Sequence, residues 1–146
     1  MREDAIILLV DDNRMDIALT LDAFREARLF NKIQVVQSGE AALNYLFGTG
    51  PYSDRTAYPL PNLILLDLKM PGIDGFEVLK RIKNTEILRR IPVIILTSSK
   101  EEEDRNLSYD IGTNSYLEKP ISFQGFIEVV KRINDYWFTL NIGADD

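Results

Sequence analysis

The chain has 146 residues, no cysteine, no histidine and a formal net charge of −6 at pH 7. A chain of this length fits one domain with a single core, it has no disulfide framework, and none of its apolar stretches is long enough to span a bilayer. The negative charge disfavours contact with nucleic acid, and residues 1–4 lead into a strand pattern without a secretory signal region, so we expect a cytoplasmic protein without direct DNA binding or membrane contact.

Short strand-like runs alternate with longer segments of helical periodicity along the chain. Strands are expected over residues 5–10, 33–36, 63–66, 91–96 and 114–118, and helices over 14–28, 40–47, 75–84, 101–111 and 123–137. The first, third and fourth runs are almost wholly apolar, as buried central strands are, whereas the other two are mixed and suit the edges. The alternation predicts an α/β fold with a doubly wound, five-stranded parallel sheet and five flanking helices.

Local signals support these boundaries. Ser38 and Ser122 precede the second and fifth predicted helices, where their hydroxyls can serve as N-caps. Gly112 follows the fourth predicted helix, at the place where a left-handed residue ends a helix, and Pro71-Gly72 marks a turn after the third strand.

Two segments depart from the regular pattern. Residues 48–62 contain too many glycines and prolines for a regular element and form a long loop, either a surface excursion tethered by its two tyrosines or a partner contact. The aromatic ending at residues 135–138 either covers the bottom of the sheet, which we favour, or marks a homodimer interface. The expected single domain is 1–146, with a core over 4–138 and a tail over 139–146.

Acidic residues stand where buried strands should end. Asp11 and Asp12 close the first apolar run, and Asp67 closes the third. Carboxylates that converge to about 4 Å repel by about 4 kcal/mol per pair at an effective dielectric of about 20, so a cation has to join them. The candidates are Lys119 and a hard divalent metal such as Mg²⁺, because Mg²⁺ takes oxygen ligands and the chain has no histidine or cysteine for a softer metal.

Other polar residues follow the remaining strands on the carboxyl side. Thr97-Ser98 come after the fourth predicted strand, and Lys119-Pro120 after the fifth. Taken alone, an aspartate after a strand is more often a helix cap than a ligand, a threonine there is a cap or turn residue, and a lysine is a solvated charge. Their joint placement at corresponding strand ends instead favours phosphate chemistry at a shared metal-carboxylate site.

Four motifs occur in order along the chain. They are Val10-Asp11-Asp12, the segment from Leu65 to Gly75 with the sequence LLDLKMPGIDG, the segment from Pro92 to Ser98, and the segment from Tyr116 to Pro120. Together they closely resemble the receiver domain of two-component response regulators, and the resemblance covers residues 4–137. It implies the flavodoxin-like receiver fold, with the strand order 2-1-3-4-5.

The resemblance implies a role for each residue of the site. Asp67 is the expected phosphoryl acceptor, which takes the group from a phosphohistidine on a sensor histidine kinase, and Lys119 is expected to pair with the phosphoryl oxygens. Mg²⁺, or Mn²⁺ in its place, is expected on the Asp12 and Asp67 carboxylates. Asp11 would then act partly through water, and the backbone carbonyl of Lys69 would be a further ligand.

The resemblance also implies a cis peptide bond between Lys119 and Pro120, and a switch formed by Thr97 and Tyr116. A hydroxyl that moves toward the phosphoryl group vacates space that an aromatic ring can fill, which couples the site to the face of the fourth helix, fifth strand and fifth helix. The alternative for Tyr116 is a residue that only packs at the edge of the sheet.

The implied protein is a stand-alone response regulator and not an enzyme, with at most Mg²⁺-dependent self-phosphorylation and self-dephosphorylation. After the fifth predicted helix no residues remain for an output domain, so we expect a downstream protein target or onward transfer of the phosphate. A homodimer through the fourth helix, fifth strand and fifth helix is a further expectation. The long loop and the aromatic ending are similar to those of stand-alone response regulators of bacterial, cyanobacterial-type phytochromes, so a phytochrome-type kinase is a further hypothesis.

Three other classes of protein share parts of this pattern. A hydrolase of the haloacid dehalogenase type needs a second aspartate two positions after the first, where this chain has Lys69. A flavodoxin-like cofactor binder needs a phosphate-cradling loop after the first strand, where Asp11-Asp12-Asn13 would repel a phosphate in the absence of a metal. A phosphorylation-independent interaction module remains open, although it does not require the acidic, hydroxyl and lysine residues.

Overall fold

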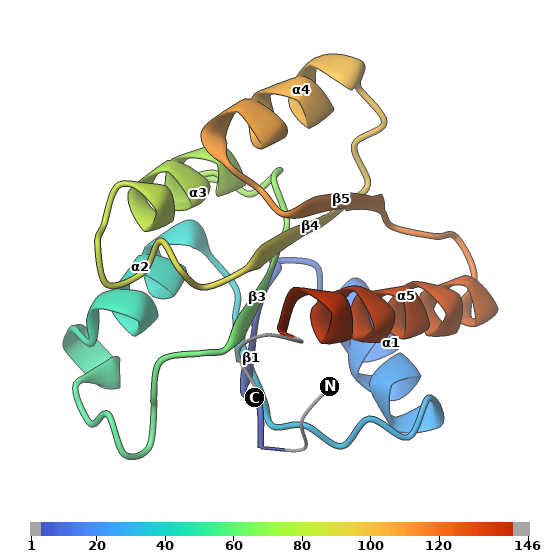
Figure 1. Ribbon diagram of the computed structural model, residues 1–146, viewed down its shortest axis with the longest axis horizontal. Coiled ribbons are helices and arrows are strands. Elements are labelled where there is room, and N and C mark those ends of the chain that lie inside the picture. The colour runs from blue at the N-terminus through green and yellow to red at the C-terminus, as the bar shows by residue number, and fades with distance from the viewer. Residues whose placement is uncertain (1–3, 142–146) are drawn as a thin grey trace.

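The strands form one parallel sheet. The computed structural model describes residues 4–141, with side chains as far as Trp137. The sheet has the order β2-β1-β3-β4-β5 (Figure 1), which confirms the predicted fold class and order. The strands are β1 (Ile7–Val10), β2 (Ile33–Val36), β3 (Leu63–Leu66), β4 (Val93–Thr97) and β5 (Ser115–Glu118).

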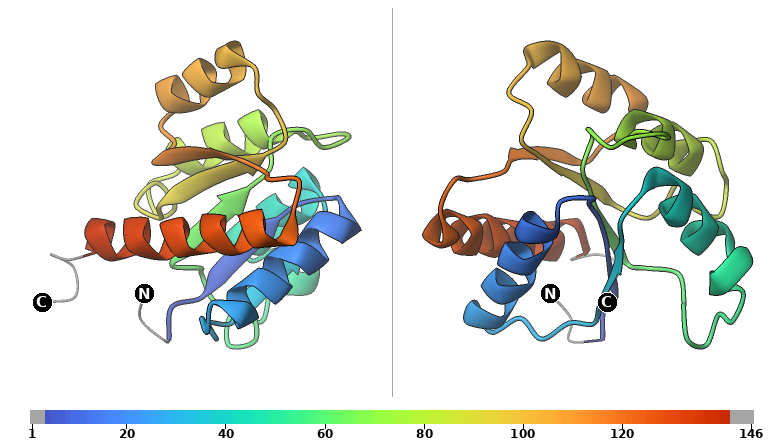
Figure 2. Two further views of the ribbon diagram at one scale, coloured as in Figure 1. Left: turned by 90° about the vertical axis from the view of Figure 1, so that its right-hand side faces the viewer. Right: turned by 180° about the vertical axis from the view of Figure 1, so that it is seen from behind.

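Helices cover both faces of this sheet (Figures 1 and 2). Two helices, α1 (Arg14–Glu26) and α5 (Phe123–Asn141), lie side by side on one face. The other face carries α2 (Gly39–Phe47), α3 (Gly75–Lys83) and α4 (Glu102–Ile111). Each helix begins within one residue of its predicted start, because the apolar periodicity and the capping residues mark those starts in the sequence.

The central strands are buried on both faces. Alternate residues of β1 and β3 point into two separate apolar clusters, one under α2 and α3 and one under α1 and α5. Each large apolar side chain that is fully buried stabilises the fold by about 1.5–3 kcal/mol relative to its exposed state. A shift of the pairing by one residue would exchange the two clusters, so packing holds the register. In that register Val10 pairs with Leu66, and the residues that follow them emerge at the same edge of the sheet.

Two predicted caps are present. The Ser38 hydroxyl accepts a hydrogen bond from the Ala41 backbone N–H at 3.0 Å, and the Ser122 hydroxyl accepts one from the Gly125 N–H at 3.1 Å. Gly112 ends α4 with a φ of 125°, a conformation that favours glycine. These contacts satisfy donors and acceptors at helix ends that would otherwise lack partners.

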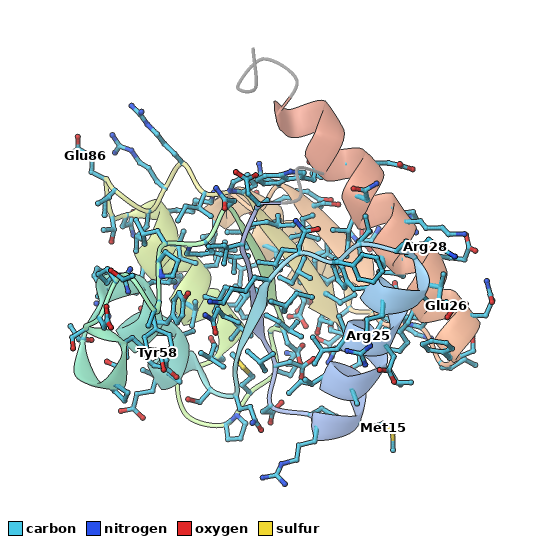
Figure 3. All side chains as sticks on the ribbon, turned by 90° about the horizontal axis from the view of Figure 1, so that it is seen from below. Met15, Arg25, Glu26, Arg28, Tyr58 and Glu86 are labelled. Atoms are coloured by element: carbon cyan, nitrogen blue, oxygen red, sulfur yellow. The ribbon has the colours of Figure 1, made fainter. Side chains whose placement is uncertain are left out.

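The loop before β3 is anchored by aromatic packing. Tyr52 and Tyr58 pack edge to face against each other, with ring centroids 5.0 Å apart, and both rings contact Tyr45 of α2. Figure 3 shows Tyr58 beside that helix. Arg55 donates to the Tyr45 carbonyl at 2.7 Å, which supplies a partner near the C-terminal end of α2. The tyrosines therefore tether the loop, and part of it, Gly50–Tyr52, forms a 3-10 turn where no regular element was expected.

The last helix is longer than the sequence pattern predicts. It continues to Asn141, so the tail expected over 139–146 starts too early, and residues 142–146 of that tail lie outside the described part. Trp137 is 2% exposed and packs in the cluster under α1 and α5, which confirms the packing interpretation for this side chain. No helix among the described residues is long and apolar enough to cross a membrane.

Gly75, the first residue of α3, provides a test of the fold beside Asp67. A Cβ atom on Gly75 would lie 2.2 Å from the Asp67 carbonyl oxygen, so Gly75→Ala has to displace backbone. We expect the variant to lose about 1–3 kcal/mol of unfolding free energy, as overpacked sites do. Gly50→Asn is the control, because Gly50 has a φ of 58°, which Asn tolerates, and open space around it. Thermal and urea denaturation of both variants measures the difference, and equal stability of the two would contradict the close-approach argument.

Candidate functional site

The acidic residues predicted to converge lie together at the carboxyl edge of the sheet. Asp11 follows β1 and is 2% exposed, Asp67 follows β3 and is 5% exposed, and Asp12 is exposed to solvent. Carboxylate oxygens of these three residues lie within 4.8 Å of one another. Asp11 and Asp67 are each the first residue after their strands. They lie side by side because the last residues of β1 and β3, Val10 and Leu66, are paired.

Lys119 brings a positive charge into this cluster. Its backbone N–H donates to the Thr97 carbonyl at 2.7 Å, which extends the pairing of β5 with β4 by one residue. Its Nζ atom then lies 2.8 Å from an Asp11 oxygen and 3.1 Å from an Asp67 oxygen. A third carboxylate, that of Asp16 in α1, lies 2.9 Å from the same nitrogen. The Lys119 side chain is 5% exposed, so these ion pairs are only weakly screened by solvent.

Burial and charge act against each other on Lys119. Burial alone lowers its pKa, but the hydrogen bonds to Asp11 and Asp16 and the negative charges of Asp67 and Asp11 outweigh burial and raise the pKa above its ordinary value. Lys119 is therefore a permanent cation at neutral pH. Burial has the larger effect on Asp11, whose pKa it raises despite the opposing bonds from Lys119 and from the Asn13 N–H. The Lys119 ammonium thus does not fully offset the burial of the Asp11 carboxylate.

The expected cis peptide bond is not present. All peptide bonds among the described residues are trans, including the bond between Lys119 and Pro120. The side chain of Lys119 reaches its three carboxylates from this trans backbone. An X-Pro bond prefers the trans isomer by about 0.5–1 kcal/mol. The ion pairs of Lys119 form with the trans isomer, so they do not oppose this preference.

The donor set fits a hard divalent cation. Asp67 Oδ1 is buried and accepts no hydrogen bond from the described residues, although its sister oxygen contacts Lys119. A buried oxygen of this kind is stabilised when it coordinates a cation. With the carboxylates of Asp11 and Asp12 it forms an all-oxygen group, which suits Mg²⁺ or Mn²⁺ more than a soft metal. Asp12 is the exposed member of the group, so an ion can retain some of its water on that side.

The two predicted switch residues lie on neighbouring strands. Thr97 is fully buried at the end of β4, and its hydroxyl accepts a hydrogen bond from the Ser99 N–H at 3.3 Å. Tyr116 is 6% exposed, and its hydroxyl donates to the Ser99 carbonyl at 3.0 Å. The Arg105 guanidinium lies 5.3 Å from the centre of the tyrosine ring. Both residues therefore contact the segment that joins β4 to α4.

Asp104, in the first turn of α4, links this segment to the loop after β3. Its carboxylate accepts a hydrogen bond from the Ser99 hydroxyl at 2.6 Å and lies 3.1 Å from Lys69 Nζ. The Ser99 bond lowers the pKa of Asp104 most, burial opposes it, and Lys69 lowers the pKa further. The Lys69 side chain therefore points to α4, while the role predicted for its backbone carbonyl stays a prediction.

Asp16 and Asp104 were not expected from the sequence. Both are acidic residues in the first turn of a helix, and such residues are common because they interact favourably with the helix N-terminus. One signal was available for Asp16: the helix that follows β1 begins at the carboxyl edge of the sheet, so its first turn lies beside the strand ends. The same signal was available for Asp104, which lies in the first turn of the helix that follows β4.

The Asp104 contacts predict an acid-dependent contribution to stability. A carboxylate whose pKa is lowered on folding stabilises the protein above its ordinary pKa of 3.8, and this stabilisation is lost as the pH falls toward the lower folded-state value. We expect Asp104→Asn to be less stable than the parent protein at neutral pH, with a difference that narrows between about pH 5 and about pH 3. Urea unfolding at several pH values tests this. A difference that stays constant with pH would contradict it.

Comparisons with known proteins agree with this geometry. Residues 7–131 match the family model described as the response regulator receiver domain. The probable methanogenesis regulatory protein FilR2 of Methanothrix harundinacea is 40% identical, over 93% of this chain and 85% of its own length. Response regulator Rcp1 of Synechocystis is 37% identical, over 90% of this chain and 88% of its own length.

Comparison with solved structures identifies the same family. The phosphorylated cyanobacterial phytochrome response regulator RcpA is 36% identical, with a TM-score of 0.85 over 94% of this chain and 96% of that one. The Mn²⁺-bound form of Rcp1 is 37% identical, with a TM-score of 0.82 over 91% of this chain and 94% of that one. The match to the family model and the identity of these relatives agree with the shared fold. The chain therefore belongs to the response regulator receiver domain family, whose members serve two-component signal transduction.

Proposed function

We propose that this chain is a phosphorylation-controlled signalling protein that accepts a phosphoryl group on Asp67 from a phosphohistidine of a sensor histidine kinase. One observation carries the proposal. Asp67 has one oxygen 3.1 Å from the Lys119 ammonium and a second, buried oxygen without a hydrogen-bond partner among the described residues, beside two further carboxylates. The acceptor therefore lies between a fixed cation and the oxygen ligands of a second cation.

In the proposed transfer, an Asp67 carboxylate oxygen forms a bond to phosphorus. The bond between phosphorus and the donor imidazole nitrogen breaks, and that nitrogen keeps the electron pair and later takes up a proton. Lys119 holds its positive charge beside the phosphoryl oxygens as negative charge spreads over them. The burial of Asp67 limits the access of water to the new acyl phosphate.

A divalent cation is part of the proposal. When bound, it neutralises the charge of the carboxylates and of the incoming phosphoryl oxygens. Asp12 and Asp67 would hold it directly, Asp11 partly through water, and the Lys69 carbonyl would be a further ligand. The Mn²⁺-bound form of the relative Rcp1 supports a divalent ion, and we propose Mg²⁺ as the ion that this chain uses.

The proposed output is a conformational change that starts at Ser99. The backbone of this residue bonds to both Thr97 and Tyr116, and its hydroxyl bonds to Asp104 of α4. The Thr97 hydroxyl oxygen accepts from the Ser99 N–H over 3.3 Å, so a displacement of that oxygen toward a phosphoryl oxygen would break this bond. This loss would disturb the contacts that hold Tyr116 and the start of α4, and the face of α4, β5 and α5 would change with them.

A protein target, rather than DNA or a membrane, is the proposed receiver of this change. Exposed apolar side chains on α4 and α5 support a protein contact there, either with a target or in a homodimer: Leu107, Tyr109 and Phe123. The name of RcpA as a phytochrome response regulator supports a phytochrome-type kinase as the partner, whereas FilR2 is named for methanogenesis. We propose no enzymatic activity beyond Mg²⁺-dependent gain and loss of the chain's own phosphoryl group. The single-domain organisation and the cytoplasmic location stay predictions.

The phosphoryl acceptor can be tested by mass. With acetyl phosphate and Mg²⁺ we expect one added phosphoryl group, stable in acid and lost in base, because an acyl phosphate hydrolyses readily in base. Asp67→Asn should abolish the addition, because an amide cannot form that bond. Intact-mass spectrometry of both proteins decides the matter, with Asp54→Asn in the long loop as a matched control. An equal mass gain in Asp67→Asn would overturn the proposal.

Metal binding has its own test. Asp12→Asn removes a charged ligand but retains the shape of the side chain, so we expect Mn²⁺ affinity to fall by at least about tenfold. Glu86→Gln is the matched control, because it removes the same charge from an exposed residue that Figure 3 shows far from Met15 at the start of α1. Electron paramagnetic resonance of free Mn²⁺ gives both affinities. Equal affinities for the two variants would exclude Asp12 as a ligand.

A further inference from the structure

The Lys119 ammonium has as many carboxylate partners in this structure as it has N–H donors. An ammonium carries three N–H donors. Its nitrogen lies within 3.1 Å of one oxygen from each of three carboxylates, those of Asp11, Asp16 and Asp67. A phosphoryl oxygen that arrives at Asp67 therefore has to displace one of these contacts before it can bond to Lys119.

The three carboxylates differ in how readily they can be released. The Asp11 side chain is 2% exposed, so it would lose its partner in an environment with little water. Asp67 carries the phosphoryl group in the modified protein, and its remaining carbonyl oxygen can still accept a hydrogen bond from Lys119. The Asp16 side chain is 23% exposed, and water can solvate it once it leaves the ammonium. Asp11 is also held by the Asn13 N–H at 2.9 Å. Asp16 is therefore the contact that exchanges at the lowest cost.

Resting on the function proposed above, we propose that Asp16 is the exchangeable partner of Lys119. It occupies the third N–H donor in the unphosphorylated protein and gives it up to a phosphoryl oxygen when Asp67 is modified. Asp16 thus competes with the phosphoryl group for the ammonium and sets how strongly the site retains that group. It is a positioning residue, because it acts on the phosphoryl group through Lys119.

The charge of Asp16 can be removed by substitution without loss of its backbone hydrogen bonds. The backbone of Asp16 is fixed independently of its carboxylate, since its N–H donates to the Asn13 side chain at 3.0 Å and its carbonyl accepts from the Thr20 hydroxyl at 2.8 Å. Asp16→Asn retains these bonds and the side-chain shape but removes the charge. Asp22→Asn is the matched control, because Asp22 lies on the same helix, carries the same charge and pairs only with exposed Arg25 among the ion pairs described for it.

The experiment measures affinity for beryllofluoride, a phosphoryl mimic, with Mg²⁺ present at about 0.15 M salt, where charges on the surface are screened. We expect Asp16→Asn to bind beryllofluoride about three- to tenfold more tightly than the parent protein, since the competing negative charge is gone and a neutral amide oxygen accepts from the ammonium more weakly than a carboxylate does. Asp22→Asn should match the parent. Equal affinities in all three proteins, weaker binding by Asp16→Asn, or the same gain in both variants would each overturn the inference.

A spectroscopic measurement on the unmutated protein tests the exchange directly. With Mg²⁺ already present, beryllofluoride should shift the carboxyl ¹³C resonance of Asp16, which loses its ammonium partner, and leave that of Asp22 unchanged. An unchanged Asp16 resonance would overturn the inference while the proposed function stands. If the unmutated protein neither binds beryllofluoride nor gains mass with acetyl phosphate, the proposed function fails, and the inference fails with it.

Discussion

The crowding of carboxylates around one buried ammonium is the interaction on which the rest of this site depends. Four aspartates, Asp11, Asp12, Asp16 and Asp67, gather at one edge of the sheet, and Lys119 contacts three of them. Such a group is stable only if cations offset the repulsion, because each close pair of carboxylates costs about 4 kcal/mol at an effective dielectric of about 20. The same excess of negative charge makes the site a receptor for a divalent ion.

The sheet supplies the rigidity that this arrangement requires. Its central strands are buried on both faces, so their register is held by packing rather than by the polar residues at their ends. Asp11 and Asp67 are therefore held side by side even though their charges repel. Gly75 allows the start of α3 to approach the Asp67 backbone closely, which adds a second constraint on the position of Asp67.

A second polar group connects the site to the surface of the protein. Asp104 contacts both Ser99 and Lys69, which come from two different loops at the carboxyl edge of the sheet. Ser99 also contacts Thr97 and Tyr116 through its backbone. Short hydrogen bonds between neighbouring residues thus connect Thr97 and Tyr116 to α4, so the proposed conformational change needs no distant rearrangement.

The sequence by itself determined the five βα units, the edge and centre strands and the helix caps, because each leaves a local pattern of apolar spacing or a capping or turn residue. It also indicated Asp11, Asp12 and Asp67, because each directly follows an apolar strand pattern. The strand order and the roles of the site residues came from the resemblance to a family. Only the tertiary structure decided the trans bond before Pro120, the extension of α5 to Asn141, and the contacts of Asp16 and Asp104. The contact of Asp16 with Lys119 joins residues 103 positions apart in the chain. An acidic residue in the first turn of a helix looks the same in the sequence whether it faces water or a buried lysine.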